Sequence, residues 1–213
     1  RHHTSSFSMP SWQVAMNELS NHDHSRFLTR TNHKVGRTNT LGPQAAEQGI
    51  NKAVFREGVV IQMTWTGAPT IYYGDEAGVC GFTDPDNRRT YPWGHEDQVL
   101  LAFHKDIIRL RRENEELRSG SLKMLESDYN FISYGRFNRK GQCAVLINNN
   151  NHPITKEIHV WEIGTPKTGK MKVILQSRDD GYCMEGAEYE IKAGKILIEM
   201  PQTSATILKF IEE

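Results

Sequence analysis

The chain of 213 residues is long enough for one or two domains, and its 26 basic side chains balance 26 acidic ones. This balance provides no electrostatic footprint for nucleic acid or for an anionic membrane, and no apolar run is long enough to span a bilayer. The 3 cysteines have no paired spacing, which argues against a disulfide framework or a zinc site and favours reduced thiols and a cytoplasmic location.

The first half of the chain alternates between predicted strands and helices. Residues 13–19 are mostly apolar and predict a buried strand, followed by a loop at residues 21–26 and a polar outer loop at residues 30–37. From Ala45 to about Trp65 the apolar residues carry a helical period with a break near Gly58, which predicts one long helix or two short ones. A short apolar strand at residues 70–73 comes next, and helix, strand and loop in this order form one unit of an α/β barrel.

A long loop and one clear helix follow this strand. Residues 74–95 are rich in Gly, Asp and Pro, and a loop of that length inside a compact domain is usually functional or disordered. The helix from about Asp97 to Arg118 keeps its apolar side chains near one face, and Ser119 and Gly120 end it.

Short strand patterns separated by turns fill the rest of the chain. The predicted strands are residues 122–125, 131–137, 143–147, 156–161, 172–175, 189–191, 196–199 and 205–211. Regular strand spacing of this kind is typical of an antiparallel β-sandwich. The expected fold class is therefore α/β plus all-β, with one domain at residues 1–119 and a second at residues 120–213.

Three motifs follow the predicted strands of the first domain. They are Asn21-His22-Asp23, Gly67-Ala68-Pro69-Thr70-Ile71-Tyr72-Tyr73-Gly74-Asp75-Glu76 and Asp84-Pro85-Asp86-Asn87-Arg88-Arg89. Their order and spacing resemble the end of the catalytic barrel in the α-amylase family, glycoside hydrolase family 13. The third motif is most similar to the neopullulanase, cyclomaltodextrinase and maltogenic amylase subgroup. The resemblance runs from about Gln13 to the C-terminus. It implies the last two strand–helix units of a (β/α)8 TIM barrel, followed by the β-sandwich.

The resemblance implies a role for each polar residue of the first motif. Retaining cleavage of a glycosidic bond needs a carboxylate nucleophile and a carboxylic acid about 5–5.5 Å apart, and in the family a third carboxylate holds the distorted sugar. The third role is expected for Asp23, and binding of sugar hydroxyls for His22. The alternatives are a loop-capping aspartate and a packed histidine. Asn21 is expected to shape the turn rather than to contact sugar, which stays open as the alternative. Arg26 is expected to anchor a carboxylate within the barrel or to form a surface ion pair.

The third motif is expected to bind sugar units on the non-reducing side. In the subgroup that this chain resembles, an aspartate and an arginine four residues later bind outer glucose units, which implies this role for Asp84 and Arg88. A local ion pair that pins the loop is the open alternative, and Asp86 and Arg89 could exchange roles with them. Trp93 is expected either to stack on a sugar face or to pack in the core.

The nucleophile and the general acid have no counterpart in the sequence. The family places them in a Gly-x-Arg-x-Asp element after the fourth strand and in a glutamate after the fifth strand, and neither occurs here. The chain begins at Arg1 without an initiator methionine or a secretion core, so we expect a C-terminal fragment that is inactive alone and needs the remainder of its barrel. The implied parent is a glycosidase of carbohydrate metabolism that acts on maltodextrins, cyclodextrins or pullulan, with an α-glucan oligosaccharide as its partner.

Two other functions stay open at this point. One is a non-catalytic carbohydrate-binding or scaffold fragment, which the presence of the first motif disfavours. The other is an α-glucosidase or glucosyltransferase of the same family, which the third motif disfavours. No cofactor or metal is assigned, because Asp75, Glu76, Asp84 and Asp86 form no spaced ligand loop, although calcium is common in the family. A homo-oligomer is compatible with the resemblance.

Overall fold

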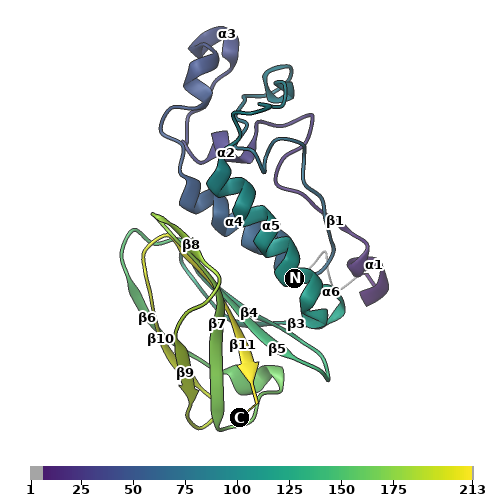
Figure 1. Cartoon of the computed structure of the whole chain (residues 1–213), viewed down its shortest axis with the longest axis vertical. Coiled ribbons are helices and arrows are strands. Elements are labelled where there is room, and N and C mark those ends of the chain that lie inside the picture. Colours follow the sequence, from purple (N-terminus) through teal and green to yellow (C-terminus); the bar gives the residue numbers. More distant parts are fainter. Residues whose placement is uncertain (1–6, 213) are drawn as a thin grey trace.

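The computed structural model describes residues 7–212 and gathers the helices in one half of the molecule and antiparallel strands in the other (Figure 1). The predicted combination of a partial α/β barrel and an all-β domain is therefore confirmed. Residues 1–6 and 213 of the two predicted domains lie outside the described part. No helix within residues 7–212 is long and apolar enough to cross a membrane.

The barrel part contains one small parallel sheet. β1 (Met16–Asn17) pairs with β2 (Ala68–Pro69). The predicted strand at residues 13–19 is too long. Its first residue belongs to helix α1 (Met9–Gln13), which has a proline in its first turn. The predicted strand at residues 70–73 is wrong. The Thr70 N–H donates to the Asn17 carbonyl at 2.8 Å, but the described residues provide no ladder beyond that point.

Helix α4 (Lys52–Thr64) is a single helix. Its first turn is capped by Asn51, whose side chain accepts hydrogen bonds from two backbone N–H groups, and the preceding residues form the short 3-10 helix η1 (Pro43–Ala46). The predicted break near Gly58 is wrong. A Cβ atom at Gly58 would lie 2.4 Å from Cε1 of Phe27, so the glycine allows a neighbouring ring to pack closely against the helix.

The helix predicted at residues 97–118 is divided at Asn114. Asp97 caps α5 (Gln98–Glu113), and the backbone of Asn114 is extended, so a new short helix, α6 (Glu115–Ser119), begins after it. The predicted outer loop lies between two further short helices, α2 (Phe27–Arg30) and α3 (Thr38–Leu41).

Two antiparallel sheets of unequal size form the second half of the chain. The larger sheet has 7 strands in the order β3-β4-β5-β11-β7-β8, with β9 pairing to β7, and the smaller sheet pairs β6 with β10. The strands are β3 (Ser121–Asp128), β4 (Phe131–Phe137), β5 (Gln142–Asn148), β6 (Ile154–Ile158), β7 (Gly169–Arg178), β8 (Gly181–Cys183), β9 (Glu188–Ile191), β10 (Ile196–Met200) and β11 (Ser204–Ile211). The predicted strand at residues 156–161 ends early, because the 3-10 helix η3 (Val160–Ile163) follows. The sequence pattern does not predict β8.

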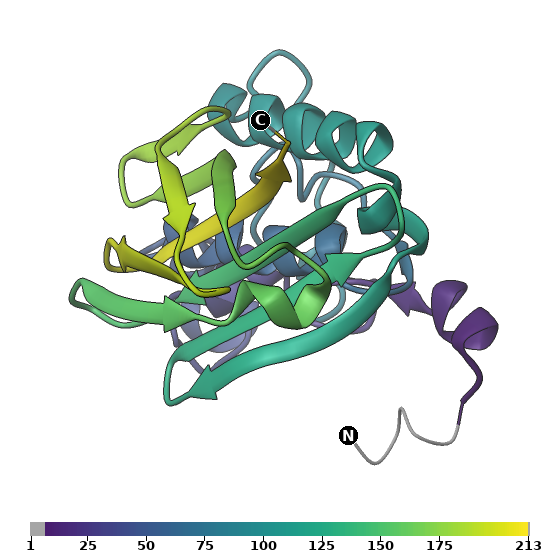
Figure 2. The same ribbon diagram turned by 90° about the horizontal axis from the view of Figure 1, so that it is seen from below.

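The larger sheet buries both of its faces. Successive residues of β5 point to opposite faces: Val145 belongs to one buried cluster with Phe55 of α4 and Phe103 of α5, whereas Leu146 belongs to another with Ile198 of β10. The first cluster attaches the helices to the sheet, and the second fills the sandwich. Figure 2 shows the strands in front, with helices behind them. The barrel part and the β-sandwich therefore share one continuous hydrophobic core.

Buried polar groups also join the two halves. Arg136 of β4 is fully buried and donates to the carbonyls of Thr64 at 2.5 Å and Gly120 at 3.0 Å. The hydroxyls of Tyr134 and Thr64 are 2.6 Å apart. The bonds from Arg136 satisfy a carbonyl at the C-terminus of α4 and another that follows α6, which the helices themselves leave unpaired. The expected domain boundary after residue 119 stays a prediction, although α6 ends at Ser119.

Candidate functional site

Two loops meet at the carboxyl edge of the parallel strands. β1 and β2 run in the same direction, so the loop at residues 18–26 and the loop at residues 70–95 leave the same edge of the sheet. In a barrel this edge is where catalytic side chains collect. The first and third sequence motifs lie in these two loops, and hydrogen bonds join them directly.

Asn21 shapes the turn that carries the candidate catalytic residue. Its side-chain oxygen accepts hydrogen bonds from the N–H groups of Asp23 at 2.9 Å and His24 at 3.1 Å. The turn presents His22 beside Asp23, with Nε2 and Oδ1 3.4 Å apart. Their side chains are 63% and 67% exposed, respectively, which leaves polar atoms of both open to a ligand.

Asn87 ties the two loops together. Its side chain is fully buried, and Nδ2 donates to the carbonyls of His24 at 2.8 Å and Asn21 at 3.2 Å. The neighbouring Arg88 donates to the carbonyl of His22 at 3.3 Å. We call this arrangement of residues 21–24 and 87–88 the loop clasp. The sequence pattern does not distinguish Asn87, because a turn-prone asparagine in a loop motif gives no signal of burial.

Arg26 lies beneath the loop clasp, fully buried. Its Nε donates to the carbonyl of Asn87 at 2.8 Å, and its Nη1 lies 2.6 Å from the carbonyl of Tyr73 and 3.0 Å from Oδ1 of Asp75. The guanidinium also lies 4.0 Å from the centre of the Tyr72 ring. Arg26 therefore anchors a buried carboxylate, and the alternative of a surface ion pair is wrong.

The carboxyl group of Asp75 is the buried partner that the sequence analysis missed. Burial raises its pKa, and hydrogen bonds from Ser20 and Arg26 offset that increase only in part. Buried carboxylates keep a paired cation because an unpaired buried charge is strongly destabilising. This pair is therefore a structural anchor that holds the end of the second motif against the first loop.

Asp84 and Arg88 form an ion pair on the loop surface. Arg88 Nε lies 2.5 Å from Asp84 Oδ1, and the two side chains are about half exposed. This is the local pair that the sequence analysis left open as an alternative to sugar binding. Exposed pairs of this type contribute only about 0–1 kcal/mol, so hydroxyl groups of a ligand can compete for both partners.

Asp86 and Arg89 are held within the loop. Asp86 accepts from the N–H of Phe82 at 2.7 Å and from Arg89 at 3.0 Å, while Arg89 also lies 2.6 Å from Glu47. Burial alone would raise the pKa of Asp86, but these hydrogen bonds outweigh it and the pKa is lower than usual. With their polar atoms occupied, these two residues are less available to a ligand than Asp84 and Arg88.

Trp93 is 79% exposed, so the alternative that it packs in the core is wrong. Its ring centre lies 4.5 Å from that of Tyr91, at an angle of 48°. The pair offers an exposed aromatic surface on the same loop as Asp84. Within residues 7–212 no group of three or more potential metal ligands is close enough to hold a metal ion.

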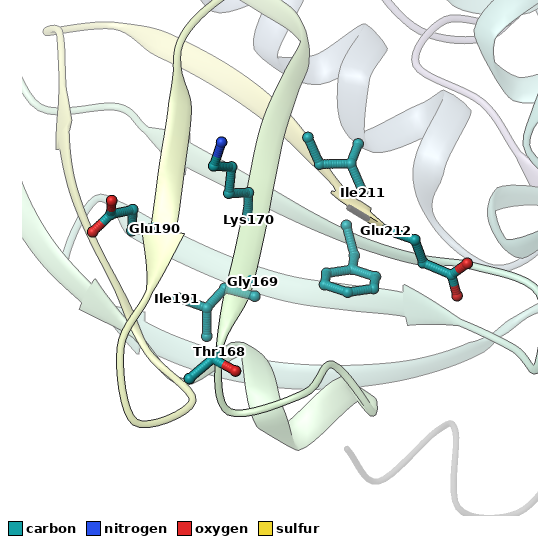
Figure 3. Close-up of a pocket in the computed structure, with 8 residues that line it drawn as sticks. Thr168, Gly169, Lys170, Glu190, Ile191, Ile211 and Glu212 are labelled. Carbon is teal, nitrogen blue, oxygen red and sulfur yellow. The ribbon is translucent and has the colours of Figure 1, made fainter.

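A hollow of about 470 Å³ lies elsewhere, in the β-sandwich (Figure 3). It is lined by residues of β7, β9 and β11 and their flanks, namely Thr168, Gly169, Lys170, Glu190, Ile191, Phe210, Ile211 and Glu212. None of these residues belongs to the three motifs. The hollow is therefore separate from the candidate site.

Comparison with known proteins gives two family matches in succession. The family described as "Alpha amylase, catalytic domain" matches residues 2–116, and "Alpha amylase, C-terminal all-beta domain" matches residues 123–211. An Anoxybacillus α-amylase structure superposes with a TM-score of 0.77 at 23% identity, over 100% of this chain and 41% of that one. This similarity concerns the fold.

Curated relatives are longer than this chain. An amylopullulanase of Thermoanaerobacter thermohydrosulfuricus is 31% identical over 205 residues, which are 95% of this chain and 14% of that protein. Neopullulanase 2 of Thermoactinomyces vulgaris is 32% identical over 200 residues, which are 92% of this chain and 29% of that protein. The chain thus spans less than a third of either relative.

Proposed function

Because the chain belongs to the α-amylase family of glycoside hydrolases, we propose that it supplies the last part of the catalytic barrel and the C-terminal domain of an enzyme that cleaves α-glucans with retention. The proposed substrates are maltodextrins, cyclodextrins or pullulan. Relatives named amylopullulanase, neopullulanase and cyclomaltodextrinase support this substrate class.

The loop clasp is the observation that carries the proposal. Backbone carbonyls of residues 21, 22 and 24 are fixed by donors from Asn87 and Arg88, while the side chains of His22 and Asp23 stay accessible. A fixed backbone below exposed polar side chains is what preorganised binding of a transition state requires.

In the proposed reaction, Asp23 stabilises the positive charge that develops on the sugar ring. His22 binds a sugar hydroxyl beside it, since its Nε2 lies within 3.4 Å of the carboxylate. Asp84 and Arg88 bind hydroxyls of an outer glucose unit, for which they exchange their weak mutual ion pair. Trp93 offers its exposed face to a sugar ring.

The nucleophile and the general acid come from the remainder of the barrel in this proposal. The short sheet of β1 and β2 supports it, because among the described residues neither strand has a partner on its outer edge. A closed barrel removes such edges, whereas an isolated parallel pair leaves them open. The chain alone is accordingly proposed to be inactive.

A chimera tests this proposal. The chimera joins the part of Thermoactinomyces vulgaris neopullulanase 2 that precedes its match to this chain with residues 1–213. We expect the chimera to hydrolyse pullulan and cyclodextrin and to act less on maltose and sucrose, while the chain alone releases no sugar. Intact neopullulanase 2 is the positive control.

Each other outcome of that experiment contradicts part of the proposal. A folded chimera that acts on none of these substrates would indicate a non-catalytic carbohydrate-binding or scaffold chain. Preference for maltose or sucrose would indicate an α-glucosidase or a glucosyltransferase. Hydrolysis by residues 1–213 alone would show that the site is complete without the remainder of the barrel.

A cytoplasmic location is also part of the proposal. Cys80 and Cys143 are buried with free thiols, and Cys183 is exposed and free. Unpaired cysteines are typical of reducing compartments. Fractionation of cells that express the natural protein tests this point, and recovery in the culture medium would contradict it.

A further inference from the structure

A pocket of about 400 Å³ lies between the segment that carries α3 and the loop of the third motif. We call it the α3 pocket, and α3 lies at the end of the molecule that points away from the β-sandwich (Figure 1). Ligand sites commonly enclose about 300–1,000 Å³, so the pocket has room for a unit the size of a sugar. Its lining residues are Arg37, Thr38, Asn39, Thr83, Asp84 and Pro85.

Arg89 fastens the two walls of the α3 pocket to each other. On the α3 side, its Nη2 donates to the carbonyl of Pro43 at 2.6 Å, and its Nη1 donates to Oε1 of Glu47 at 2.6 Å. On the side of the third motif, its Nε donates to Oδ1 of Asp86 at 3.0 Å, and its Nη2 lies 3.1 Å from Oδ2. The pocket is therefore held open between two segments that a bidentate guanidinium joins.

The side chains of the pocket offer both donors and acceptors. The guanidinium of Arg37 only donates, and the carboxylate of Asp84 only accepts. Asn39 and Thr83 do both, and the Thr83 hydroxyl is buried without a hydrogen-bond partner among residues 7–212. One positive and one negative charge balance, and Pro85 adds an apolar ring. The set therefore suits a neutral ligand with several hydroxyl groups, rather than an ion.

A chain of contacts leads from the candidate catalytic residue to the α3 pocket. His22 lies beside Asp23, and its carbonyl accepts from Arg88 at 3.3 Å. Arg88 in turn pairs with Asp84, which lines the pocket. In the proposed function, Asp84 and Arg88 bind an outer glucose unit on the non-reducing side. A glucan that continues in the same direction reaches the α3 pocket next.

We propose that the α3 pocket is a further subsite, which binds one glucose unit of an α-glucan beyond the unit that Asp84 and Arg88 hold. The proposal rests on the proposed function, because it lengthens the glucan site of the same enzyme. Arg37 and Asn39, both with exposed side chains, bind hydroxyl groups of this unit, and Thr83 supplies its unused hydroxyl. The consequence is a preference for long glucans over short ones.

Binding of maltoheptaose to residues 1–213 tests this inference without catalysis, because both walls of the pocket belong to the chain. In an NMR titration of the isotope-labelled chain, we expect saturable shifts at the amides of Arg37, Asn39 and Thr83. Arg37→Ala should weaken binding by at least about tenfold, since it removes a charged donor. Arg139→Ala, which removes the same side chain from an exposed turn of the β-sandwich, should bind as the wild type does.

Two results of the titration would overturn the inference. One is the absence of shifts at these amides, or equal binding after Arg37→Ala. The other is a response of the same amides to inorganic phosphate but not to maltoheptaose, which would indicate an anion site at Arg37 instead of a sugar subsite.

The chimera shows whether the subsite acts in catalysis. Maltotriose that spans the scissile bond has too few units to reach the α3 pocket, whereas maltoheptaose is long enough. We expect Arg37→Ala to lower kcat/KM for maltoheptaose by about tenfold and to leave kcat/KM for maltotriose unchanged. Arg139→Ala should change neither value. Equal losses on both substrates would overturn the inference, because they would place Arg37 outside a distal subsite.

The two readouts separate this inference from the proposed function. A chimera that releases no sugar would contradict the proposed function, and the titration of residues 1–213 would still decide whether the α3 pocket binds glucan. A chimera that hydrolyses pullulan, with the same preference for chain length before and after Arg37→Ala, would overturn the subsite and leave the proposed function intact.

Discussion

At the scale of single residues, Asn87 holds in place the loop that carries the candidate site. Its buried amide donates to two carbonyls of the loop that carries Asp23, and its own carbonyl accepts from Arg26. The exposed side chains of the site therefore rest on a network of buried hydrogen bonds. These bonds fix the backbone of the loop, while Oδ1 of Asn87 and Nη2 of Arg26 have no hydrogen-bond partner among the described residues.

Asn87→Ala removes both of these donors and leaves two carbonyls of the loop without a partner. We expect the free energy of unfolding of the chain to fall by about 2 kcal/mol. Urea unfolding of residues 1–213 measures this change. The matched control is Asn39→Ala on the exposed side of α3, which should stay within about 0.5 kcal/mol of the wild type. Equal losses in the two variants would show that the loop clasp is not held by Asn87.

We expect the stability of the chain to depend on pH because the carboxyl group of Glu57 is buried. Burial, with a contribution from Asp179, raises its pKa from 4.5 to about 8. The folded state keeps a proton that the unfolded state has lost, so this group's contribution to stability falls as the pH rises from about 4.5 to about 8 and is constant above.

Glu57→Gln should remove that contribution. Between pH 5 and pH 8 the wild-type chain should lose stability relative to the variant by on the order of a few kcal/mol. Urea unfolding at the two pH values measures the difference, and every other titrating group cancels in the comparison. Glu190→Gln is the control at an exposed carboxylate. Parallel pH profiles for wild type and Glu57→Gln would contradict the burial of a protonated carboxyl group.

The positions of these residues in two loops could be predicted from the sequence, but the burial of their neighbours could not. The motif that contains Asp23 and the motif that contains Asp84 were placed in two loops, and the structure brings those loops together. The burial of Arg26 was not decided, because a charged residue in a polar loop has no periodic pattern that indicates what covers it. The roles assigned to Asp23 and His22 stay predictions.

At the scale of elements, helix α4 joins the two halves of the chain, because it contacts both α5 and the large sheet. Apolar periodicity predicted its presence and its end near Trp65. The same pattern suggested a break at Gly58, where the helix is in fact regular. A glycine required by the ring of a distant residue cannot be distinguished from a helix breaker by local sequence alone.

Gly58→Ala separates these two explanations. Alanine favours a helix by about 1 kcal/mol over glycine, so a propensity effect alone would stabilise the chain. We expect a net loss of about 1–3 kcal/mol instead, because the new Cβ would lie 2.4 Å from the Phe27 ring. Thermal unfolding measures the sign. The double variant with Phe27→Ala should show no further loss from Gly58→Ala, and stabilisation by Gly58→Ala alone would contradict the packing argument.

The predicted strands show which features of a sheet local sequence can predict and which it cannot. The strands at β4 and β5 were predicted within one residue, since their largely apolar runs fit a sheet that is buried on both faces. The strand at residues 70–73 was wrong because strand structure there depends on neighbours in the barrel. Pairing is a property of the assembled sheet, and a short apolar segment carries no information about a missing partner.

At the scale of the whole molecule, the β-sandwich has a buried cluster of its own between its two sheets, whereas the two-stranded sheet of the barrel part has open edges. We therefore expect limited proteolysis of the isolated chain to cut within residues 7–95 before it cuts within residues 121–211. Mass spectrometry of the early fragments locates the cuts. Early cleavage inside the β-sandwich, with the first part intact, would contradict this order. In the chimera the same sites in the first part should become resistant.

The kcat of the chimera on pullulan and cyclodextrin, with and without Asp23→Asn, tests the central claim most directly. The account predicts a fall of at least about a hundredfold in kcat at unchanged Tm, because the variant removes a charge that acts on the transition state. Asp180→Asn, at an exposed turn of the β-sandwich, should keep full activity. A folded Asp23→Asn chimera that retains more than half of its kcat would contradict the assignment of this site.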